Sequence, residues 1–112
     1  MQNFIKNIDF SKVLKLSTLV EYKDEQVVSR TLAQNKALSV TLFAFDKNEE
    51  ISSHSSTGDA LVYIIDGAAE ITIAENKYTL KSGETIVMPA GIPHALLAIE
   101  KFKMLLIVVF GL

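Results

Sequence analysis

Apolar and polar residues alternate in short runs along most of this chain, a pattern that predicts β-strands. The clearest run is ALSVTLFAF, residues 37–45, in which every second residue from Leu38 to Leu42 is aliphatic. Other runs are rich in β-branched or alternating apolar residues and cover 27–33, 59–66, 69–74, 77–81, 84–88, 94–100 and 102–110. Short strands that recur about every ten residues are typical of an all-β sandwich or barrel.

Polar residues between the runs predict the turns. Glu75 and Asn76 separate two runs and predict a tight hairpin, because asparagine tolerates the left-handed conformation that such turns need. A single helical turn is expected at FSKVL, residues 10–14, with Ser11 as its N-cap. The last run is apolar on both faces, which favours a central strand or one covered by another subunit.

Length and composition indicate one ordinary globular domain, with 112 residues of which 49% are hydrophobic and 21% charged. The net charge of −2 provides no basic surface that could hold a nucleic acid. The chain has no cysteine, which excludes disulfides and thiolate metal sites. Its longest apolar run, 104–110, is too short to span a bilayer, and residues 1–10 carry no signal-peptide pattern. We therefore expect a soluble, cytoplasmic protein without nucleic-acid or membrane partners.

Most of the glycines, prolines and histidines gather in two clusters, and the second reads GETIVMPAGIPHALLA, residues 83–98. Gly83 permits a turn with positive φ before a strand. Pro89 ends that strand, because proline has no N–H to donate to a neighbouring strand. Gly91 and Pro93 then form a tight corner from which His94 starts the next strand. A histidine held by such a corner points in a defined direction, although a single histidine on a strand is more often structural or solvated.

The second cluster resembles the second signature motif of the cupin family. That motif reads Gly, five residues, Pro, one residue, Gly, two residues, His, three residues, Asn. Gly83, Pro89, Gly91 and His94 match at this spacing, and Ala98 stands where the asparagine would be.

The first cluster resembles the first cupin motif, which reads Gly, five residues, His, one residue, His, three or four residues, Glu, six residues, Gly. Only His54 and Gly67 match. Asn48 replaces the first glycine, which is a mild change because asparagine also tolerates positive φ. Ser56 replaces the second histidine, and Ala60 replaces the glutamate.

The resemblance implies a small double-stranded β-helix, or jelly-roll barrel, formed by residues 1–112 as one domain. It also implies a homodimer, in which the N-terminal extension of about 25 residues makes contact with the partner. In metal-binding cupins, three histidines and one glutamate hold an iron, manganese, zinc or nickel ion inside the barrel. Of these four ligands, only His54 and His94 remain here.

Two imidazoles alone are a weak metal site, because catalytic zinc takes three protein ligands and non-haem iron(II) two histidines and a carboxylate. Asp59 is the nearest candidate for a third ligand, but it lies one residue from the glutamate position and would face outward in a regular strand. A bulge at Gly58 would turn it inward. Glu50 is a weaker candidate. The expected cofactor is therefore none, or a weakly bound divalent metal ion (Fe, Mn, Ni or Zn).

Three functions follow from this pattern, and the sequence indicates no particular reaction. The first is a small-molecule-binding barrel with an apolar cavity, in which the two histidines anchor a ligand such as a carboxylate, phenol or ketone. Its lining would be His54, Ser56, Ala60, Val62, Met88, His94, Leu96 and Ala98. The second is a metal-dependent enzyme of dioxygenase or isomerase type, with His54, His94 and Asp59 as ligands. The third is a structural module whose barrel is filled by side chains and whose His54 is an exposed loop residue.

Overall fold

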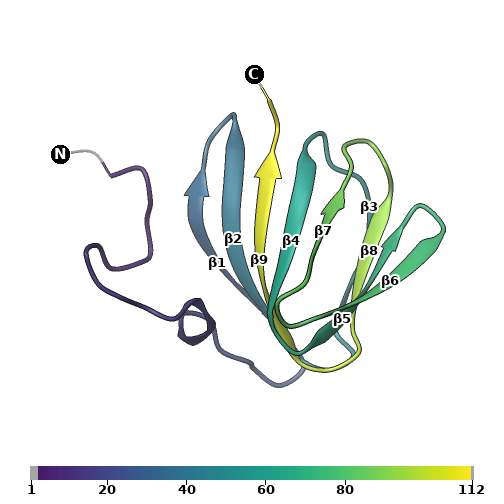
Figure 1. The fold of residues 1–112 in the computed structure, drawn as a ribbon, viewed down its shortest axis with the longest axis horizontal. Coiled ribbons are helices and arrows are strands. Elements are labelled where there is room, and N and C mark those ends of the chain that lie inside the picture. Colours follow the sequence, from purple (N-terminus) through teal and green to yellow (C-terminus); the bar gives the residue numbers. More distant parts are fainter. Residues whose placement is uncertain (1–2, 112) are drawn as a thin grey trace.

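The computed structural model describes residues 3–111, which form two antiparallel sheets packed face to face (Figure 1). The five-stranded sheet has the order β1 (Val27–Gln34), β2 (Leu38–Phe45), β9 (Phe102–Val109), β4 (Asp59–Asp66), β7 (Thr85–Met88). The four-stranded sheet has the order β3 (Glu50–His54), β8 (His94–Ala98), β5 (Ala68–Ile73), β6 (Asn76–Lys81). Residues 3–111 contain one further element, the 3₁₀ helix η1 (Leu16–Thr18). The predicted all-β jelly roll is confirmed.

All eight predicted strands are present, and their bounds differ from the prediction by two residues or fewer. The last strand, β9, lies in the middle of the five-stranded sheet, which explains why it is apolar on both faces. The ninth strand, β3, was not predicted. Its sequence EISSH has one aliphatic residue, Ile51, and its two serines interrupt any apolar alternation.

The inner faces of the two sheets form the main core of the barrel. On β4 the buried and exposed positions alternate, so that Ala60, Val62 and Ile64 point inward, as the sequence predicted. Phe45, the last residue of β2, stacks on Phe102, the first residue of β9, with their ring centroids 4.4 Å apart. Both side chains are fully buried and belong to the main core.

The predicted tight hairpin between β5 and β6 is present, but its turn is shifted by one residue. Ile73 pairs with Asn76, so the loop residues are Ala74 and Glu75, and Ala74 adopts the positive φ of 54°. The helical turn expected at residues 10–14 does not form, because Ser11 has a left-handed φ of 57°. An isolated turn without a packed face gains too few hydrogen bonds to be stable.

Two motif positions have the backbone that the sequence suggested. Asn48, which stands at the first glycine position, has a φ of 71°. Gly67 has a φ of 78°, and a Cβ atom there would lie 1.8 Å from the carbonyl oxygen of Lys101. Gly67 is therefore required both for its conformation and for the close approach of the two backbones.

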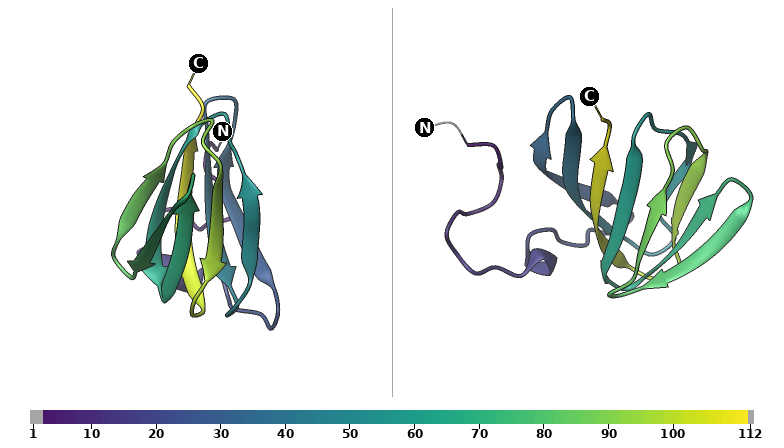
Figure 2. Two further views of the ribbon diagram at one scale, coloured as in Figure 1. Left: turned by 90° about the vertical axis from the view of Figure 1, so that its right-hand side faces the viewer. Right: turned by 45° about the horizontal axis from the view of Figure 1, so that its top comes forward.

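Residues 3–26, which we call the N-terminal arm, run along the outside of the five-stranded sheet and project from one side of the barrel (Figure 2). The Lys6 N–H donates to the Leu32 carbonyl at 2.8 Å, and the Tyr22 hydroxyl donates to Asp66 at 2.6 Å. Arm side chains also cover a second, smaller core on the outer face, built on Leu32, Leu42 and Ala44. The expected role of this extension in a dimer stays a prediction, and residues 1, 2 and 112 of the expected domain lie outside the described part of the chain.

Across residues 3–111, no helix is long and apolar enough to span a membrane.

Candidate functional site

Strands β3 and β8 bring the two histidines together at one end of the barrel. Ile51 pairs with Leu96 and His54 pairs with His94, so β3 has one more residue than β8 between these pairs. This extra residue is a β-bulge, and without it Ser53 would lie opposite His94. The imidazole rings meet edge to face, with centroids 4.5 Å apart and planes inclined by 72°. From the sequence, a bulge was considered only at Gly58, as a way to turn Asp59 inward, and this bulge between Ile51 and His54 was not predicted.

Hydrogen bonds between the two motif loops hold the corner that precedes His94. The Gly91 N–H donates to the Ser56 carbonyl, and the Ala90 N–H donates to the Asp59 carboxylate, each at 2.8 Å. Gly91 has a φ of 76°, which the tight corner requires. Two residues of the first motif, Ser56 and Asp59, therefore hold the corner in place, and the corner in turn sets where β8 begins.

His54 is exposed, and its ring is held by its own strand. Its Nδ1 lies 2.9 Å from the Ser52 carbonyl oxygen. A carbonyl oxygen only accepts hydrogen bonds, so Nδ1 carries the proton in this contact. In the neutral imidazole the other nitrogen, Nε2, then has a free lone pair and can accept a hydrogen bond from a ligand.

His94 is the one buried polar residue of the described chain, with 3% of its surface exposed. Its Nδ1 is buried and has no hydrogen-bond partner in residues 3–111. Burial lowers the pKa of His94 below its ordinary value of 6.5, the neighbouring His54 lowers it further, and a hydrogen-bonding contribution from the backbone of Ile92 raises it by a smaller amount. At neutral pH the imidazole is therefore uncharged and has one donor and one acceptor.

The other predicted lining residues lie in the main core. Five of them belong to one buried cluster and are at most 3% exposed: Ala60, Val62, Met88, Leu96 and Ala98. Ser56 is half-buried, and its hydroxyl accepts the Gly58 N–H at 3.1 Å. The structure thus places five of these residues inside the barrel core, while the contact of any of them with a ligand stays a prediction.

The structure does not bring a third metal donor to the two imidazoles. Asp59 and Ala60 pair in register with β9, without a bulge, so Asp59 faces outward and its carboxylate is occupied by Ala90. Gly58 instead allows a close approach, since a Cβ atom there would lie 2.6 Å from the Val109 carbonyl. Glu50 is exposed and lines a groove with Glu70 on the outside of the four-stranded sheet.

No group of three or more histidine and carboxylate side chains within residues 3–111 could hold a metal ion. Two imidazoles fall short of the three protein ligands of a catalytic zinc site and of the two histidines and one carboxylate of a non-haem iron site. The residues present therefore do not fit the metal centre that the family resemblance implies.

The His54–His94 pair can form hydrogen bonds with a ligand at the edge of an apolar core. Uncharged His94 is buried on β8, paired with Ile73 of β5 on one side and with His54 of β3 on the other, and it touches the exposed ring of His54. Small-ligand sites are commonly built in this way, from an apolar surface with a few fixed polar groups.

Comparison with known proteins supports the fold and leaves the ligand open. The family model described as "Cupin domain" matches residues 41–110. A conserved protein of unknown function from Streptococcus pyogenes is 53% identical, with 96% of this chain and 95% of that chain covered and a TM-score of 0.95. A cupin superfamily protein from Desulfitobacterium hafniense is 34% identical, with 96% and 98% covered and a TM-score of 0.91.

A cupin 2 conserved barrel domain protein from Leptotrichia buccalis is 39% identical, with 86% of this chain and 47% of that chain covered and a TM-score of 0.84. Among curated proteins, none matches the chain.

Proposed function

Because the chain belongs to the cupin family, we propose that it binds a small organic molecule at the His54–His94 pair, with the two imidazoles as polar anchors and without a catalytic metal ion. The unpaired Nδ1 of His94 carries this proposal. A buried polar atom without a partner lowers the stability of the fold by about 1–3 kcal/mol. A bound molecule that forms a hydrogen bond with Nδ1 of His94 would remove this cost.

The chemistry of the two rings restricts the ligand. Uncharged His94 does not attract an anion by charge, so its partner is a neutral group: the hydroxyl of a phenol or of a carboxylic acid, which donates and accepts, or the carbonyl of a ketone, which only accepts. A ligand with a hydroxyl can also donate a hydrogen bond to Nε2 of His54, since Nδ1 of that ring is bound to the Ser52 carbonyl. The aliphatic core beneath the rings favours a ligand whose remaining surface is apolar.

The same arrangement would support proton transfer if a bound molecule were reactive. An imidazole with a pKa near neutrality can act as a general base or acid, and burial moves His94 toward the base form. Binding comes first in this proposal, and a reaction is not needed for it.

Nuclear magnetic resonance of the imidazole nitrogens tests the proposal directly. Histidine-labelled protein is titrated with phenol, benzoic acid or acetophenone, and separately with Zn²⁺. We expect an organic probe to shift the signals of both rings in the unmodified protein and the shift of the His94 ring to weaken in His54→Ala. His54 is exposed, so this variant leaves the barrel intact.

Two outcomes would contradict the proposal. If no organic probe shifts either ring at saturating concentration, the barrel is a filled structural module. If Zn²⁺ binds stoichiometrically and His54→Ala abolishes it, the site is a metal centre after all, and the second interpretation of the sequence replaces the first.

A further inference from the structure

Three hydroxyl side chains lie on the inner face of the five-stranded sheet. On β2, Phe43 and Phe45 pack in the main core, and the strand pairs with β9 without a break in register. Ser39 and Thr41 therefore lie on the same inner face, because every second side chain of a strand points the same way. Thr31 of β1 pairs with Thr41 and extends the group, which we call the hydroxyl patch.

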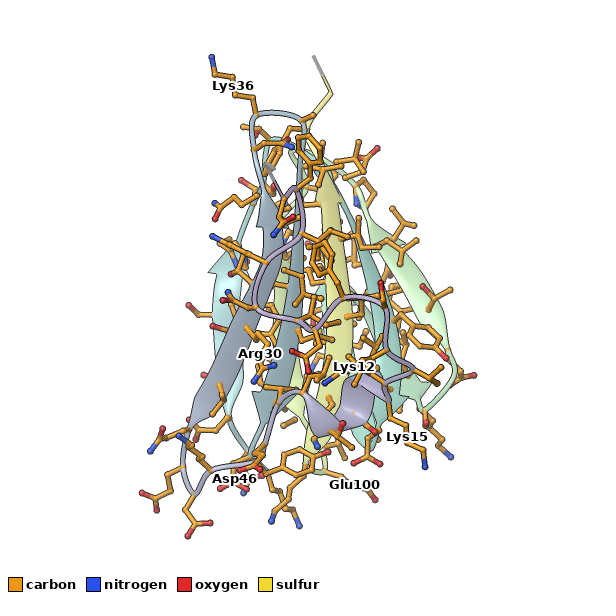
Figure 3. All side chains as sticks on the ribbon, turned by 90° about the vertical axis from the view of Figure 1, so that its left-hand side faces the viewer. Lys12, Lys15, Arg30, Lys36, Asp46 and Glu100 are labelled. Carbon is orange, nitrogen blue, oxygen red and sulfur yellow. The ribbon has the colours of Figure 1, made fainter. Side chains whose placement is uncertain are left out.

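The neighbours of these residues point to the opposite side of the sheet. Arg30, which precedes Thr31, donates to the Asn7 carbonyl of the arm at 3.2 Å, and Figure 3 labels it beside the arm. Val40, the β2 residue in the middle of the patch, packs against the outer core that the arm covers. The patch itself therefore faces the four-stranded sheet.

The patch lies at the same end of the barrel as the two histidines. Ser39 pairs with Val108 of β9, and Ala60 of β4 pairs with Val108 from the other side. The row continues to Met88, the last residue of β7, from which the corner leads to His94. The inner face at this end is thus apolar on β9, β4 and β7 and carries hydroxyls on β1 and β2.

Solvent reaches the inner face of the barrel on the side of the patch. Val62 of β4 and Ile71 of β5 are fully buried, whereas Phe43 of β2 and Ile51 of β3 pack against the same core and stay half-buried. Strands β1 and β3 are the edges of their sheets, so no sheet hydrogen bonds join them to each other. The patch and the exposed His54 therefore both lie on the more open side of the barrel.

The hydroxyls of the patch are available to a ligand. All three residues are half-buried. The hydroxyls of Ser82 and Thr85 donate to backbone carbonyls, whereas none of the three patch hydroxyls has a hydrogen-bond partner within residues 3–111. A hydroxyl both donates and accepts, so the patch can bind a hydroxyl or a carbonyl group of a neutral molecule.

We propose that Ser39 and Thr41 determine the specificity of the histidine site, because they bind a second polar group of the ligand that the imidazoles hold. This inference rests on the proposed function, since it needs a ligand at the two histidines. Sheets that pack face to face lie about 10 Å apart, so one ring with a polar group at each end spans the distance between the facing side chains. The ligand class is a small neutral ring compound with two polar groups, such as a hydroxyphenyl ketone, whose apolar body lies against Ala60 and Met88.

Three related probes test this inference by titration of the histidine-labelled protein. Acetophenone and phenol each carry one polar group, and para-hydroxyacetophenone carries both. We expect para-hydroxyacetophenone to bind about three- to tenfold more tightly than the better of the other two, which is the contribution of one neutral hydrogen bond. The double variant Ser39→Ala with Thr41→Val should lose this gain and still bind the probes with one group. The matched control Thr72→Val removes a half-buried hydroxyl from the outer face of the four-stranded sheet and should keep the gain.

Two further measurements separate a lost hydrogen bond from altered packing. Thr41→Ser retains the hydroxyl and should keep most of the gain. Nuclear Overhauser effects are expected from the ring protons of para-hydroxyacetophenone to the methyl group of Thr41 and not to that of Thr72, and circular dichroism confirms that each variant is folded.

The outcomes distinguish this inference from the proposed function. If phenol or acetophenone shifts the imidazole signals but the second group adds no affinity, the inference is wrong and the histidine site stands. The same conclusion follows if the double variant keeps the gain or if Thr72→Val loses it to the same extent. If no probe shifts either imidazole signal, the proposed function and this inference fail together.

Discussion

Replacement of His94 by leucine should make this protein more stable. The ring is 3% exposed and its Nδ1 is buried without a partner, which costs about 1–3 kcal/mol. Leucine has a similar volume and no polar atom, so it removes this cost and keeps the packing. The edge-to-face contact with His54 is lost, which subtracts about 0.5–1.5 kcal/mol. We expect a net gain of about 1 kcal/mol in the free energy of unfolding at about pH 7.5.

The gain should grow as the pH falls. The unfolded chain protonates this histidine near pH 6.5, whereas the folded chain does so only at a lower pH, because burial and His54 lower the pKa of His94. Above pH 6.5 both states are neutral at this residue and it adds no pH dependence. Below pH 6.5 the unfolded state binds more protons, so the stability of the unmodified protein falls until the pH has passed the lower, folded pKa. His94→Leu lacks this loss.

Urea denaturation of both proteins at about pH 7.5 and about pH 5.5 measures the two effects, with His54→Ala as the control for the lost ring contact. The slope of the unfolding free energy against urea should stay the same in all three proteins. Two results would refute the reasoning. His94→Leu could be less stable than the unmodified protein at the higher pH, which would mean that Nδ1 is satisfied in solution. The difference between the two proteins could also stay constant with pH, which would mean that the histidine titrates normally.

Three further predictions concern the scaffold. Gly67→Ala should lower the free energy of unfolding, measured by thermal denaturation, by about 3 kcal/mol or more, because φ is 78° and the new methyl group would lie 1.8 Å from a backbone carbonyl oxygen. Gly83→Ala, where φ is 89° but the space is open, should lower it by only about 1–2 kcal/mol. Burial and the hydrogen bond to Asp66 raise the pKa of the Tyr22 phenol. In an absorbance titration at alkaline pH, Tyr22→Phe should therefore lose a tyrosine ionisation at the high-pH end of the curve. Asp59→Ala should lower the unfolding free energy by about 1 kcal/mol in urea and speed hydrogen exchange at the 89–93 corner, because the carboxylate accepts a hydrogen bond from its backbone.

The sequence predicted those parts of the fold whose cause is local. Alternation along β4 placed Ala60, Val62 and Ile64 inside the barrel, because the side chains of a strand point to opposite faces whatever surrounds it. Pro89 ended β7 for an equally local reason, the missing N–H. The apolar residues on both faces of β9 predicted a central strand or one covered by another subunit, and the structure places it in the middle of the sheet.

The rest depended on partners that are distant in the chain. Nothing within EISSH indicates a strand, and β3 exists because β8 supplies its hydrogen bonds. The bulge that places His54 opposite His94 likewise depends on the pairing of the two strands. The spacing of the motifs therefore suggested that the two histidines lie close together, but it did not predict the bulge that brings them there. Ala74 shows the reverse case, since the hairpin register forces a positive φ on alanine although asparagine two residues later would adopt it more easily.

The two lost ligand positions explain why the histidine pair matters. The hydroxyl of Ser56 closes its own turn on Gly58, and Ala60 is 2% exposed opposite Met88 in the core, so both positions now belong to the scaffold. The buried positions around them are apolar and carry no cost for a buried polar group. His94 alone carries that cost among the buried residues of 3–111. This unpaired imidazole is the observation on which the proposed ligand site rests, and the comparison of His94→Leu with the unmodified protein measures its cost.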